Sequence, residues 1–468
     1  MSNEPRRKRR RIHPVIKLLF SVAAICMLLY LSGFAFRYCL GLFIADESYI
    51  LQLPGKDSPI VEVIPEQDSN LSGEPGTVSQ TGRTTIVVAG DIMPHLPVIR
   101  SGQINDSYDF SSIFEYVKAY VSDADYAVVN LETTFSGTDG GREYKGHPDF
   151  NAPDALATSA YASGFDLMLT GNNRCYDYGT SGMLRTLETI RSAGLDTLGT
   201  KAAVEEASYL VKDLNGVKVG MICYTFADIA SDRNMPIIDD VQTDSKAAGL
   251  INVFDYGNLD MFYAEMENNV SAMKASGAEA IVMYIHWGDQ FDTNPTNSQK
   301  AMAQRLCDLG VDVIVGSHPH VVQPVELLTS ADGTRRTLCA YSLGNFLSNQ
   351  REDNIGVALS EDGLLLRFTL VEYSDGGVYL EDMELIPTWV LVRGSDGNKT
   401  YRILPLNTSS DGWKEAFNLN NTQLGNAQKS LNRTNGVVDT SLKTVQSLLA
   451  QETIQRGEET GTFTGGVG

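Results

Sequence analysis

Three of the six histidines in this chain lie where a predicted β-strand ends. His318 and His320 follow the short apolar segment 312–315, and His286 is the last residue of the apolar segment 281–286. Ligands of open α/β sheets bind outside the carboxyl ends of the strands, so these side chains are candidates for one site. Neutral imidazole is the commonest metal ligand in proteins. The pattern therefore indicates a metal site, and the alternative is a set of turn histidines satisfied by local hydrogen bonds.

Oxygen-bearing side chains follow the three predicted strands that come first in the chain. Asp91 ends the strand that starts at Thr84, Asn130 and Glu132 end the next, and Asn173 follows the third. Residues two apart on a strand project from the same face, so Asn130 and Glu132 would lie side by side. Burying that pair without a partner would be costly, and a metal ion or an arginine would remove the cost. These positions add oxygen ligands to the imidazoles, although Asp91 alone would also fit a turn or a helix cap.

Further residues near these strand ends are candidates for contacts with a substrate. Arg174 could hold a carboxylate or phosphate in a bidentate fork, and His95 could bind or polarise the same group. Asn345 follows a glycine that permits close backbone approach and could hydrogen-bond a ligand, although an ordinary strand end would also explain it. We assign His95, Arg174 and Asn345 as candidate catalytic residues. The candidate substrate-binding residues are Arg174, Trp287 and Gln323.

The elements that must position these residues indicate an α/β fold. Apolar segments typical of buried strands recur at 84–90, 126–131, 165–170, 217–224, 281–286, 311–315 and 337–343. Helical periodicity lies between several of them, near 153–163, 181–193, 259–276 and 298–309. This alternation predicts a sheet whose faces are covered by helices. Beyond residue 356, alternating strands around Ser374–Gly377 predict an antiparallel hairpin, and with it a second, partly antiparallel sheet.

Charge and cysteine content limit the partners. The formal net charge is −21, and the first 17 residues hold seven Lys or Arg and one acid, so the rest is more acidic than the total. Such a surface argues against nucleic acid as a partner. It would also repel a polyanion unless a metal or a local basic patch compensates. The cysteines show no paired metal-ligand spacing and imply no disulfide framework.

The amino-terminal region predicts a membrane anchor. A basic arm, residues 1–17, precedes an apolar run, residues 18–37, of about the length that crosses a bilayer as a helix. Lysine and arginine before the run orient the amino end toward the cytoplasm. A cleaved signal peptide is the alternative, and the absence of a small-x-small cleavage site after Phe36 favours an uncleaved anchor.

The rest of the chain divides by composition. Residues 38–83 are rich in polar residues, Pro and Gly, and are predicted to form an extracellular stalk. Residues 84–405 are the predicted globular domain. Residues 406–468 are predicted to be a polar, partly disordered tail with a helix near 440–453.

The strand-end residues together carry a family resemblance. Their order (Asp, Asn with Glu, Asn, His, then His-x-His) resembles the layout of calcineurin-type metallophosphatases. More closely, the chain resembles the CapA family of poly-γ-glutamate capsule synthesis proteins over about residues 84–346. The motifs that carry the resemblance are Gly90-Asp91-Ile92-Met93, Asn130-Leu131-Glu132, Asn172-Asn173 with Asp177-Tyr178-Gly179, His286-Trp287-Gly288, His318-Pro319-His320 with Gln323-Pro324, and Ser342-Leu343-Gly344-Asn345-Phe346.

The resemblance implies an α/β/β/α metallophosphatase-like sandwich with mixed sheets, preceded by one transmembrane helix and held on the outer face of a bacterial membrane. It also implies one or two divalent ions, and mixed nitrogen and oxygen ligands suit Mn, Fe or Zn better than Mg. The implied partners are an anionic γ-glutamyl polymer or its synthase subunits, in polymer synthesis, export or anchoring. The implied metal ligands are Asp91, Glu132, Asn173, His286, His318 and His320.

Two departures from the family pattern leave two functions open. Arg174 stands where the family usually has the His of Asn-Asn-His, and Gln290 stands where it tends to have Glu. Both departures remove a titratable group, and His147 is a candidate replacement for the first. The first hypothesis is a metal-dependent hydrolase of phosphoester or γ-glutamyl bonds. The alternative is a non-catalytic subunit that binds the polymer or the synthase on the same fold. No Gly-x-Ser-x-Gly elbow, P-loop or His-Glu-x-x-His motif supports other enzyme classes.

Overall fold

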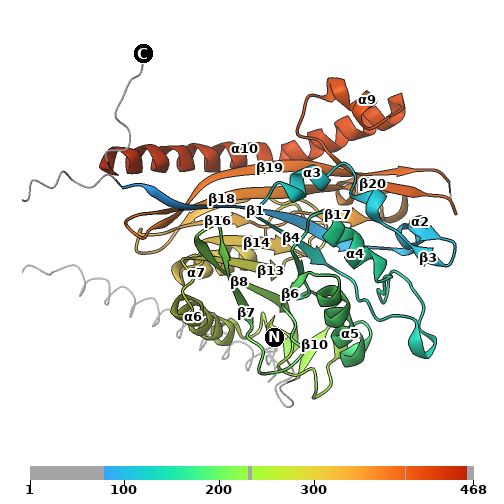
Figure 1. Ribbon diagram of the computed structural model, residues 1–468, viewed down its shortest axis with the longest axis horizontal. Helices are drawn as coiled ribbons and strands as arrows, with labels where there is room; N and C mark the ends of the chain where they lie inside the picture. The colour runs from blue at the N-terminus through green and yellow to red at the C-terminus, as the bar shows by residue number, and fades with distance from the viewer. Residues whose placement is uncertain (1–77, 230–234, 396, 461–468) are drawn as a thin grey trace, which may run out of the picture. The chain divides into compact units, whose positions relative to one another are not determined.

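Two large β-sheets pack face to face in the computed structural model, which describes residues 78–229, 235–395 and 397–460 (Figure 1). In the first sheet the strands lie in the order β20 (Thr400–Pro405), β19 (Val378–Arg393), β18 (Asp362–Tyr373), β1 (Gln80–Met93), β4 (Tyr126–Leu131), β5 (Leu167–Leu169) and β6 (Asp196–Leu198). β17 (Asn345–Ser348) pairs with the carboxyl end of β1. β1 is parallel to β4 and β17 and antiparallel to β18, so the sheet is mixed.

The second sheet is also mixed and contains the two strands that precede the histidines. Its order is β12 (Val253–Phe254), β8 (Val217–Phe226), β13 (Ala280–His286), β14 (Val313–Ser317), β16 (Arg336–Ala340) and β15 (Val325–Thr329), with β7 (Tyr209–Leu214) also paired to β8. β8, β13, β14 and β16 are parallel, whereas β7 and β15 are antiparallel to their neighbours.

Helices cover the outer face of each sheet. The first sheet is covered by α3 (Lys118–Ser122), α4 (Ala155–Ala162) and α5 (Gly179–Ser192), and the second by α6 (Leu259–Ala275) and α7 (Asn297–Asp308). Alternation along β1 explains the layers: Val87 and Ala89 pack toward the helices, whereas Ile86 and Val88 face the second sheet. The structure thus has the predicted α/β class and layered α/β/β/α arrangement.

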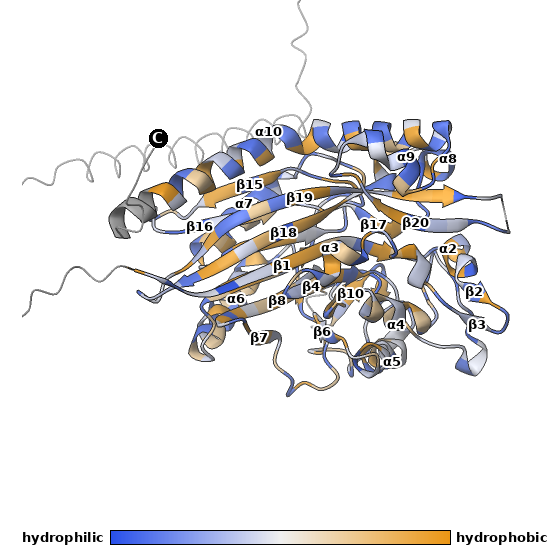
Figure 2. Cartoon of the chain, turned by 45° about the horizontal axis from the view of Figure 1, so that its top comes forward, coloured by the Kyte–Doolittle hydropathy of each residue, from blue (hydrophilic) through white to orange (hydrophobic). Residues whose placement is uncertain are grey.

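The central strands are buried on both faces, which explains their continuous apolar sequences. Every residue of β4 and β13 is buried, as expected for parallel strands between two layers. Figure 2 shows orange along much of β1 and β18, two further strands of the sandwich. Burying a side chain such as Val128 or Val282 stabilises the fold by roughly 1.5–3 kcal/mol. This packing holds the strand ends, and the polar residues on them, in fixed positions.

Short elements connect these layers. They are α2 (Leu96–Ser101), α8 (Glu352–Ile355), β2 (Gln103–Ile104), β3 (Ser107–Tyr108), β9 (Asp228–Ile229), β10 (Pro236–Ile238), β11 (Val241–Gln242) and the 3-10 turns Ser111–Ile113, Asp139–Gly141, Ala358–Glu361 and Ser410–Gly412. β9, β10 and β11 form a small antiparallel sheet of their own.

The hairpin predicted around Ser374–Gly377 is present, but the sheet predicted for it is wrong. β18 and β19 form the hairpin, and β18 pairs with β1 along most of its length. The antiparallel strands therefore extend the first sheet. The separate second sheet is built instead from the strands that precede His286 and His318.

The region after residue 406 differs from the predicted polar tail. It contains α9 (Trp413–Ala416) and the 40-residue helix α10 (Asn421–Thr460). Val438, Val445 and Leu449 are buried in the core between the sheets, and their helical spacing gives α10 an apolar stripe. α10 lies along β19 and β15, so the stripe packs against a strand of each sheet. The abundance of Asn, Ser and Thr on its other faces hides this stripe in the sequence.

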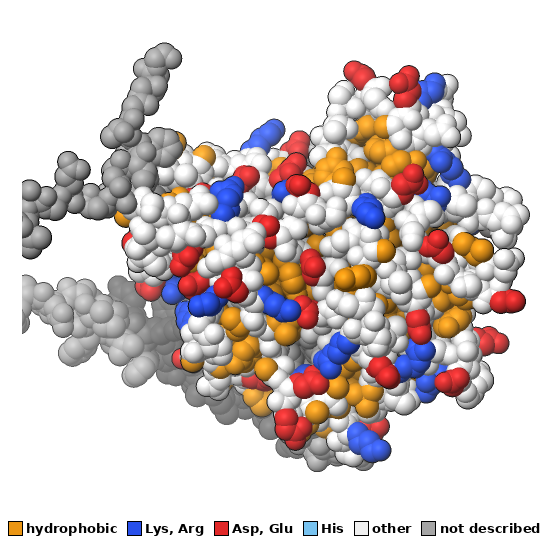
Figure 3. Space-filling view, viewed as in Figure 1, with side chains coloured by type: hydrophobic (Ala, Val, Ile, Leu, Met, Phe, Trp, Pro, Cys, Tyr) orange, Lys and Arg blue, Asp and Glu red, His pale blue; other side chains and the backbone are white. Residues whose placement is uncertain are grey.

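In the part of the chain that the structure describes, no helix is long and apolar enough to cross a membrane. The predicted anchor at 18–37 lies outside the described residues. On the face shown in Figure 3, acidic side chains are interspersed with basic ones. An anionic partner on this face would therefore depend on a local site, because no extended basic surface is seen there.

Candidate metal centre

The carboxyl ends of strands from both sheets bring the six predicted metal ligands into one cluster. The first sheet supplies Asp91, Glu132 and Asn173 from β1, β4 and β5 or the residues that follow them. The second sheet supplies the histidines. None of the six is more than 6% exposed: Asp91, Glu132, Asn173, His286, His318 and His320.

Asp91, Glu132 and His320 form one half of the cluster. His320 Nδ1 lies 3.1 Å from Asp91 Oδ2, and His320 Nε2 lies 3.4 Å from Glu132 Oε1. Asn130 donates from Nδ2 to Asp91 Oδ1 at 2.8 Å, and Asn172 donates to Asn130 Oδ1 at 3.1 Å. Partners of this kind orient metal-binding carboxylates. The chain of two amides therefore fixes Asp91 in place.

Glu132 also belongs to the other half of the cluster, with His286 and His318. His286 Nε2 lies 3.8 Å from Glu132 Oε1 and 3.1 Å from His318 Nδ1. Asn173 Oδ1 lies 3.1 Å from the same Nε2 atom. On the far side of the ring, Ser317 Oγ lies 2.8 Å from His286 Nδ1. Because Nδ1 is held by Ser317, Nε2 is the nitrogen directed at the cluster.

The turn after β14 holds its two histidines in an uncommon backbone conformation. His318 has φ 96° and His320 has φ 55°. Residues with a side chain rarely adopt this region, at a cost of about 1–3 kcal/mol each. At Gly316, just before the turn, a Cβ would lie 2.0 Å from the carbonyl oxygen of Tyr341. The surrounding packing therefore fixes a strained turn, and strain of this kind is typical of functional sites.

Burial and neighbouring charges shift the pKa values of the cluster in opposite directions. Burial raises the pKa of Glu132 to about 8, with Asp91 adding to the shift and His320 opposing it. Burial lowers the pKa of His318 to about 3 and that of His286 well below its ordinary value. Burial also acts to lower the pKa of His320, but the Glu132 and Asp91 carboxylates outweigh it and the net shift is upward.

The donor set fits a divalent cation. Glu132 Oε1 is buried and has no hydrogen-bond partner, which is a costly state for a carboxylate oxygen. Around it, one donor atom each from Glu132, His286 and His318 lie within 4.8 Å of one another, and so do donor atoms from Asp91, Glu132 and His320. A cation would satisfy the unpaired oxygen. The two sets that share Glu132 fit one or two divalent ions.

Arg174 follows Asn173 directly and has two acidic partners. Its Nη1 atom lies 2.5 Å from Asp239 Oδ2 and 3.7 Å from Asp177 Oδ1. Burial raises the pKa of Asp177 to about 7, against the opposing charge of Arg174. Arg174 also contributes to the lowered pKa of His318. Arg174, which was predicted to contact substrate, therefore lies beside the cluster, and its guanidinium is paired with Asp239 and Asp177.

His95 is half-buried near the cluster. Its Nδ1 atom lies 3.0 Å from the Met93 carbonyl oxygen, and its ring meets the Phe150 ring edge-on at 5.2 Å. Burial lowers its pKa to about 4, against the hydrogen bond to Met93 that acts to raise it, and charge on His320 is a smaller contribution in the same direction as burial. His147, the candidate replacement for the missing family histidine, is exposed. It also contributes to lowering the pKa of His95.

Comparisons with known proteins identify the family. The model of the bacterial capsule synthesis protein family PGA_cap matches residues 85–350, more than half of the chain. The chain belongs to this family, the CapA family. The capsule biosynthesis protein CapA of Bacillus anthracis is 26% identical over 337 residues, covering 70% of this chain and 74% of its own. The PGA biosynthesis protein CapA of Bacillus subtilis is 25% identical over 292 residues, covering 61% of this chain and 68% of its own.

A solved structure from Staphylococcus aureus, of a protein assigned as a 5'-nucleotidase, aligns with a TM-score of 0.37. It is 12% identical to this chain and covers 75% of this chain and 58% of that one. At this score the likeness supports no conclusion about the CapA-family chain.

Two of the predicted substrate-binding residues lie in the core of this CapA-family domain instead. Trp287 is 0% exposed, and its Nε1 donates to the Tyr341 carbonyl oxygen at 3.0 Å. Gln323 is 0% exposed, donates to the Asp292 carbonyl oxygen at 2.8 Å and accepts from Gln299 at 2.9 Å. Their polar groups are used internally, so the prediction that they contact substrate is wrong.

Asn345, predicted as catalytic, lies behind the cluster. Its Nδ2 donates to the carbonyl oxygens of His320 and Ser360, at 3.3 and 3.0 Å, and to Gln350 at 2.9 Å. It is 0% exposed. The structure therefore gives Asn345 a role in positioning the backbone of His320, while its buried Oδ1 has no hydrogen-bond partner.

Three residues near the cluster were not predicted. Ser317 orients His286, and its place directly before the His-x-His turn was the available signal. The Phe226 ring stacks on His286 at 6.1 Å and meets His318 edge-on at 4.9 Å. Asp239, the partner of Arg174, lies 65 positions further along the chain, and nothing in the sequence pattern links the two.

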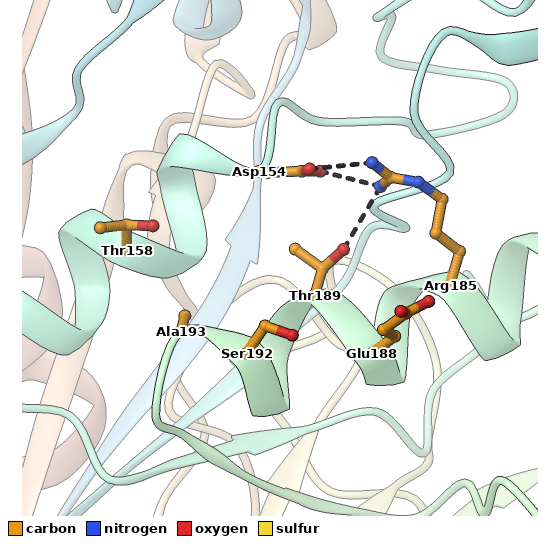
Figure 4. A pocket seen from close by; sticks show the side chains of 7 residues that line it. All are labelled: Asp154, Thr158, Arg185, Glu188, Thr189, Ser192 and Ala193. Atoms are coloured by element: carbon orange, nitrogen blue, oxygen red, sulfur yellow. Dashed lines mark hydrogen bonds and ion pairs between the residues drawn. The ribbon is translucent and has the colours of Figure 1, made fainter.

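A separate depression of about 450 Å³ lies between α4 and α5 (Figure 4). Arg185 spans it from α5 and forms two hydrogen bonds of 2.8 Å with Asp154. The lining residues include no histidine or cysteine. The Arg185–Asp154 pair joins the two helices, and the depression offers none of the metal or proton chemistry of the cluster.

Proposed function

We propose that this chain is a metal-dependent hydrolase acting on phosphoester or γ-glutamyl bonds in the synthesis, export or anchoring of a capsule polymer. The observation that carries the proposal is the buried cluster in which two sets of ligands share Glu132. Support for the process comes from relatives named for capsule and PGA biosynthesis. The polymer or its synthase subunits are the proposed partners.

The residues that would hold the ions are Asp91, Glu132, Asn173, His286, His318 and His320. When bound, divalent ions would supply Lewis acidity and a water of lowered pKa. The mixed nitrogen and oxygen ligands favour Mn, Fe or Zn.

The chain's own groups prepare the site for such chemistry. Ser317 and the Asn130–Asn172 pair fix the directions of His286 and Asp91. The lowered pKa of His95 keeps its ring neutral at pH 7. Nδ1 of His95 is engaged by the Met93 carbonyl oxygen at 3.0 Å and the Asn349 N–H at 3.4 Å, which leaves Nε2 for the substrate or water.

We further propose a location on the outer face of the bacterial membrane. The basic arm at 1–17 and the apolar run at 18–37 support a single anchor with its amino end in the cytoplasm. The stalk at 38–83 would separate the domain from the bilayer.

Metal content and hydrolysis test the proposal together. The full-length protein is expected to retain one or two equivalents of transition metal, and the variant His318→Ala/His320→Ala to lose them while keeping its circular dichroism spectrum. Hydrolysis of a γ-glutamyl oligomer or a phosphoester should require the metal and stop on chelation. A wild-type protein that folds without metal, and in which added Mn, Fe or Zn produces no hydrolysis, would refute the proposal.

A further inference from the structure

The contact between Arg174 and Asp239 places an acidic side chain of the protein where a substrate's acid would be recognised. Arg174 is 8% exposed, whereas the side chain of Asp239 is 41% exposed. Asp239 is therefore the more exposed partner of the pair, with a distance of 2.5 Å between Oδ2 and Nη1.

The turn that carries Asp239 is the two-residue loop of the β10–β11 hairpin. Asp239 has φ 48° and Asp240 has φ 63°, and Ile238 pairs with Val241 on either side of them. Positive φ at both central residues is the preferred geometry of such a loop, and aspartate accepts it readily. The hairpin therefore holds Asp239 in a defined position against Arg174.

Arg174 retains hydrogen-bonding capacity that the protein does not use. Its Nε atom is buried and has no hydrogen-bond partner. Nη1 carries the contacts to Asp239 and to the Pro148 carbonyl oxygen at 2.9 Å, and the guanidinium lies 5.5 Å from the centre of the Phe150 ring. A carboxylate that takes the place of Asp239 at Nη1 would also accept from Nη2, and the unused Nε donor lies on the other edge of the guanidinium.

The position of Arg174 ties it to the cluster. Its backbone N–H donates to Asn172 Oδ1 at 3.1 Å, and the intervening Asn173 lies 3.1 Å from His286 through Oδ1. A group held by Arg174 is thereby placed beside the ligands of the metal centre. The guanidinium charge also acts on Glu132 and the three cluster histidines.

We infer that Arg174 selects a substrate carboxylate next to the scissile bond, and that Asp239 occupies Arg174 as an internal stand-in which the substrate displaces. This inference rests on the proposed function, because each residue of a γ-linked glutamate chain keeps a free α-carboxylate close to its amide bond. Asp239 is itself a carboxylate of the same charge and geometry. The substrate class is therefore a γ-glutamyl chain with free α-carboxylates.

Binding measurements on the full-length protein test the inference independently of hydrolysis. The probes are a tetramer of γ-linked glutamate, the same tetramer with its α-carboxylates converted to amides, and inorganic phosphate. Asp239→Asn is expected to tighten binding of the first probe about tenfold, as removal of a competing charge-assisted hydrogen bond implies, and to leave the amide probe unchanged. Isothermal titration calorimetry gives the dissociation constants.

Variants of Arg174 and a neighbouring control complete the design. Arg174→Gln should abolish binding of the carboxylate tetramer, and Asp239→Asn should have no further effect in that background. Arg174→Lys keeps the charge but removes the fork, and serves if the glutamine variant does not fold. Asp240→Asn makes the same change in charge one residue away, on an exposed side chain, and should leave binding unaltered.

The outcomes separate this inference from the proposed hydrolase. Tighter binding of phosphate but not of the tetramer in Asp239→Asn would overturn carboxylate selection. Equal loss of binding for all three probes, with a lower Tm, would show that Asp239 only supports the fold. Absence of hydrolysis with the expected binding pattern intact would reject the hydrolase and leave the role of Arg174 standing.

Discussion

The two halves of the cluster differ in charge although they share Glu132. The Asp91 half has two carboxylates and one imidazole, His320, whose pKa is raised. The other half has one carboxylate and two imidazoles, His286 and His318, whose pKa values are lowered. Metal binding requires neutral imidazole. Burial therefore keeps a histidine neutral, as metal binding requires, only where no second carboxylate lies beside it. In the Asp91 half, His320 must lose its proton before a metal ion can bind.

Replacement of the shared residue should have the largest effect. Glu132→Gln removes a ligand from both halves, so metal content should fall to near zero. Activity should fall by more than the 10- to 100-fold that is typical when a residue hydrogen-bonded to a metal ligand is replaced. Tm of the metal-free protein should change little near pH 7, because burial keeps Glu132 largely protonated there and glutamine matches that uncharged state. Metal analysis and thermal unfolding in chelator check both. The exposed Glu415→Gln is the control; retention of a full metal complement by Glu132→Gln would disprove a shared ligand.

Replacement of one residue from each half should separate the halves. Asp91→Asn is expected to remove the ion of its own half and to leave the His286–His318 half loaded, while His318→Ala should do the reverse. Each variant should then carry about one equivalent less than wild type, as measured by mass spectrometry of the metals. Loss of all metal from both variants would show that the halves bind cooperatively or hold a single ion.

The stability of the metal-free protein should fall as pH rises from about 6.5 to 8. Glu132 and His320 both have a folded-state pKa above the unfolded one, so the folded state binds more protons in this window and stability declines. The lowered pKa values of His286 and His318 act only below about 6.5. The expected decline is about 2 kcal/mol, from urea unfolding in chelator. Glu132→Gln should reduce it, and a rise in stability over this range would contradict these shifts.

The smallest effect is expected from the residue behind His286. Ser317→Ala removes the group that holds Nδ1 at 2.8 Å, so metal affinity of the His286–His318 half should fall about tenfold while the Asp91 half is unaffected. Stepwise metal titration by calorimetry would show one weakened step. Asn130→Ala is the matched change on the other half, through Asp91, and equal weakening of both steps by either variant would argue against separate halves.

Sequence patterns predicted the cluster because each of its residues lies at the end of a buried apolar strand or shortly after it. Parallel strands bring such ends to one edge, so Asp91, Glu132, Asn173 and the histidines meet without knowledge of any long-range contact. The same reasoning failed at Trp287. As the residue after His286 it projects from the opposite side of the strand, and it packs against Tyr341 in the core. Alternation along the strand was enough to predict this.

Other features depend on contacts between distant residues, which patterns in one sequence do not contain. Gln323 can be buried because Gln299, on α7, donates a hydrogen bond to its side-chain oxygen. Asp239 reaches Arg174 from a small separate sheet. In α10, an apolar stripe that includes Val438 and Val445 is spread thinly among polar residues, so composition outweighed periodicity in the prediction of the tail.

The pairing of β1 also sets the order in which the domain can fold. Asp91 pairs with Asn345, 254 residues further along the chain, and the rest of β1 pairs with β18, 276 to 293 residues further along, so closing this sheet is a slow, non-local step. During synthesis β1 has only β4 as a partner and presents an open edge. The backbone of Asp91 is secured by the Gly344 carbonyl oxygen. The metal centre is therefore completed late, because a chain interrupted before residue 344 lacks the hydrogen bond that secures the backbone of Asp91.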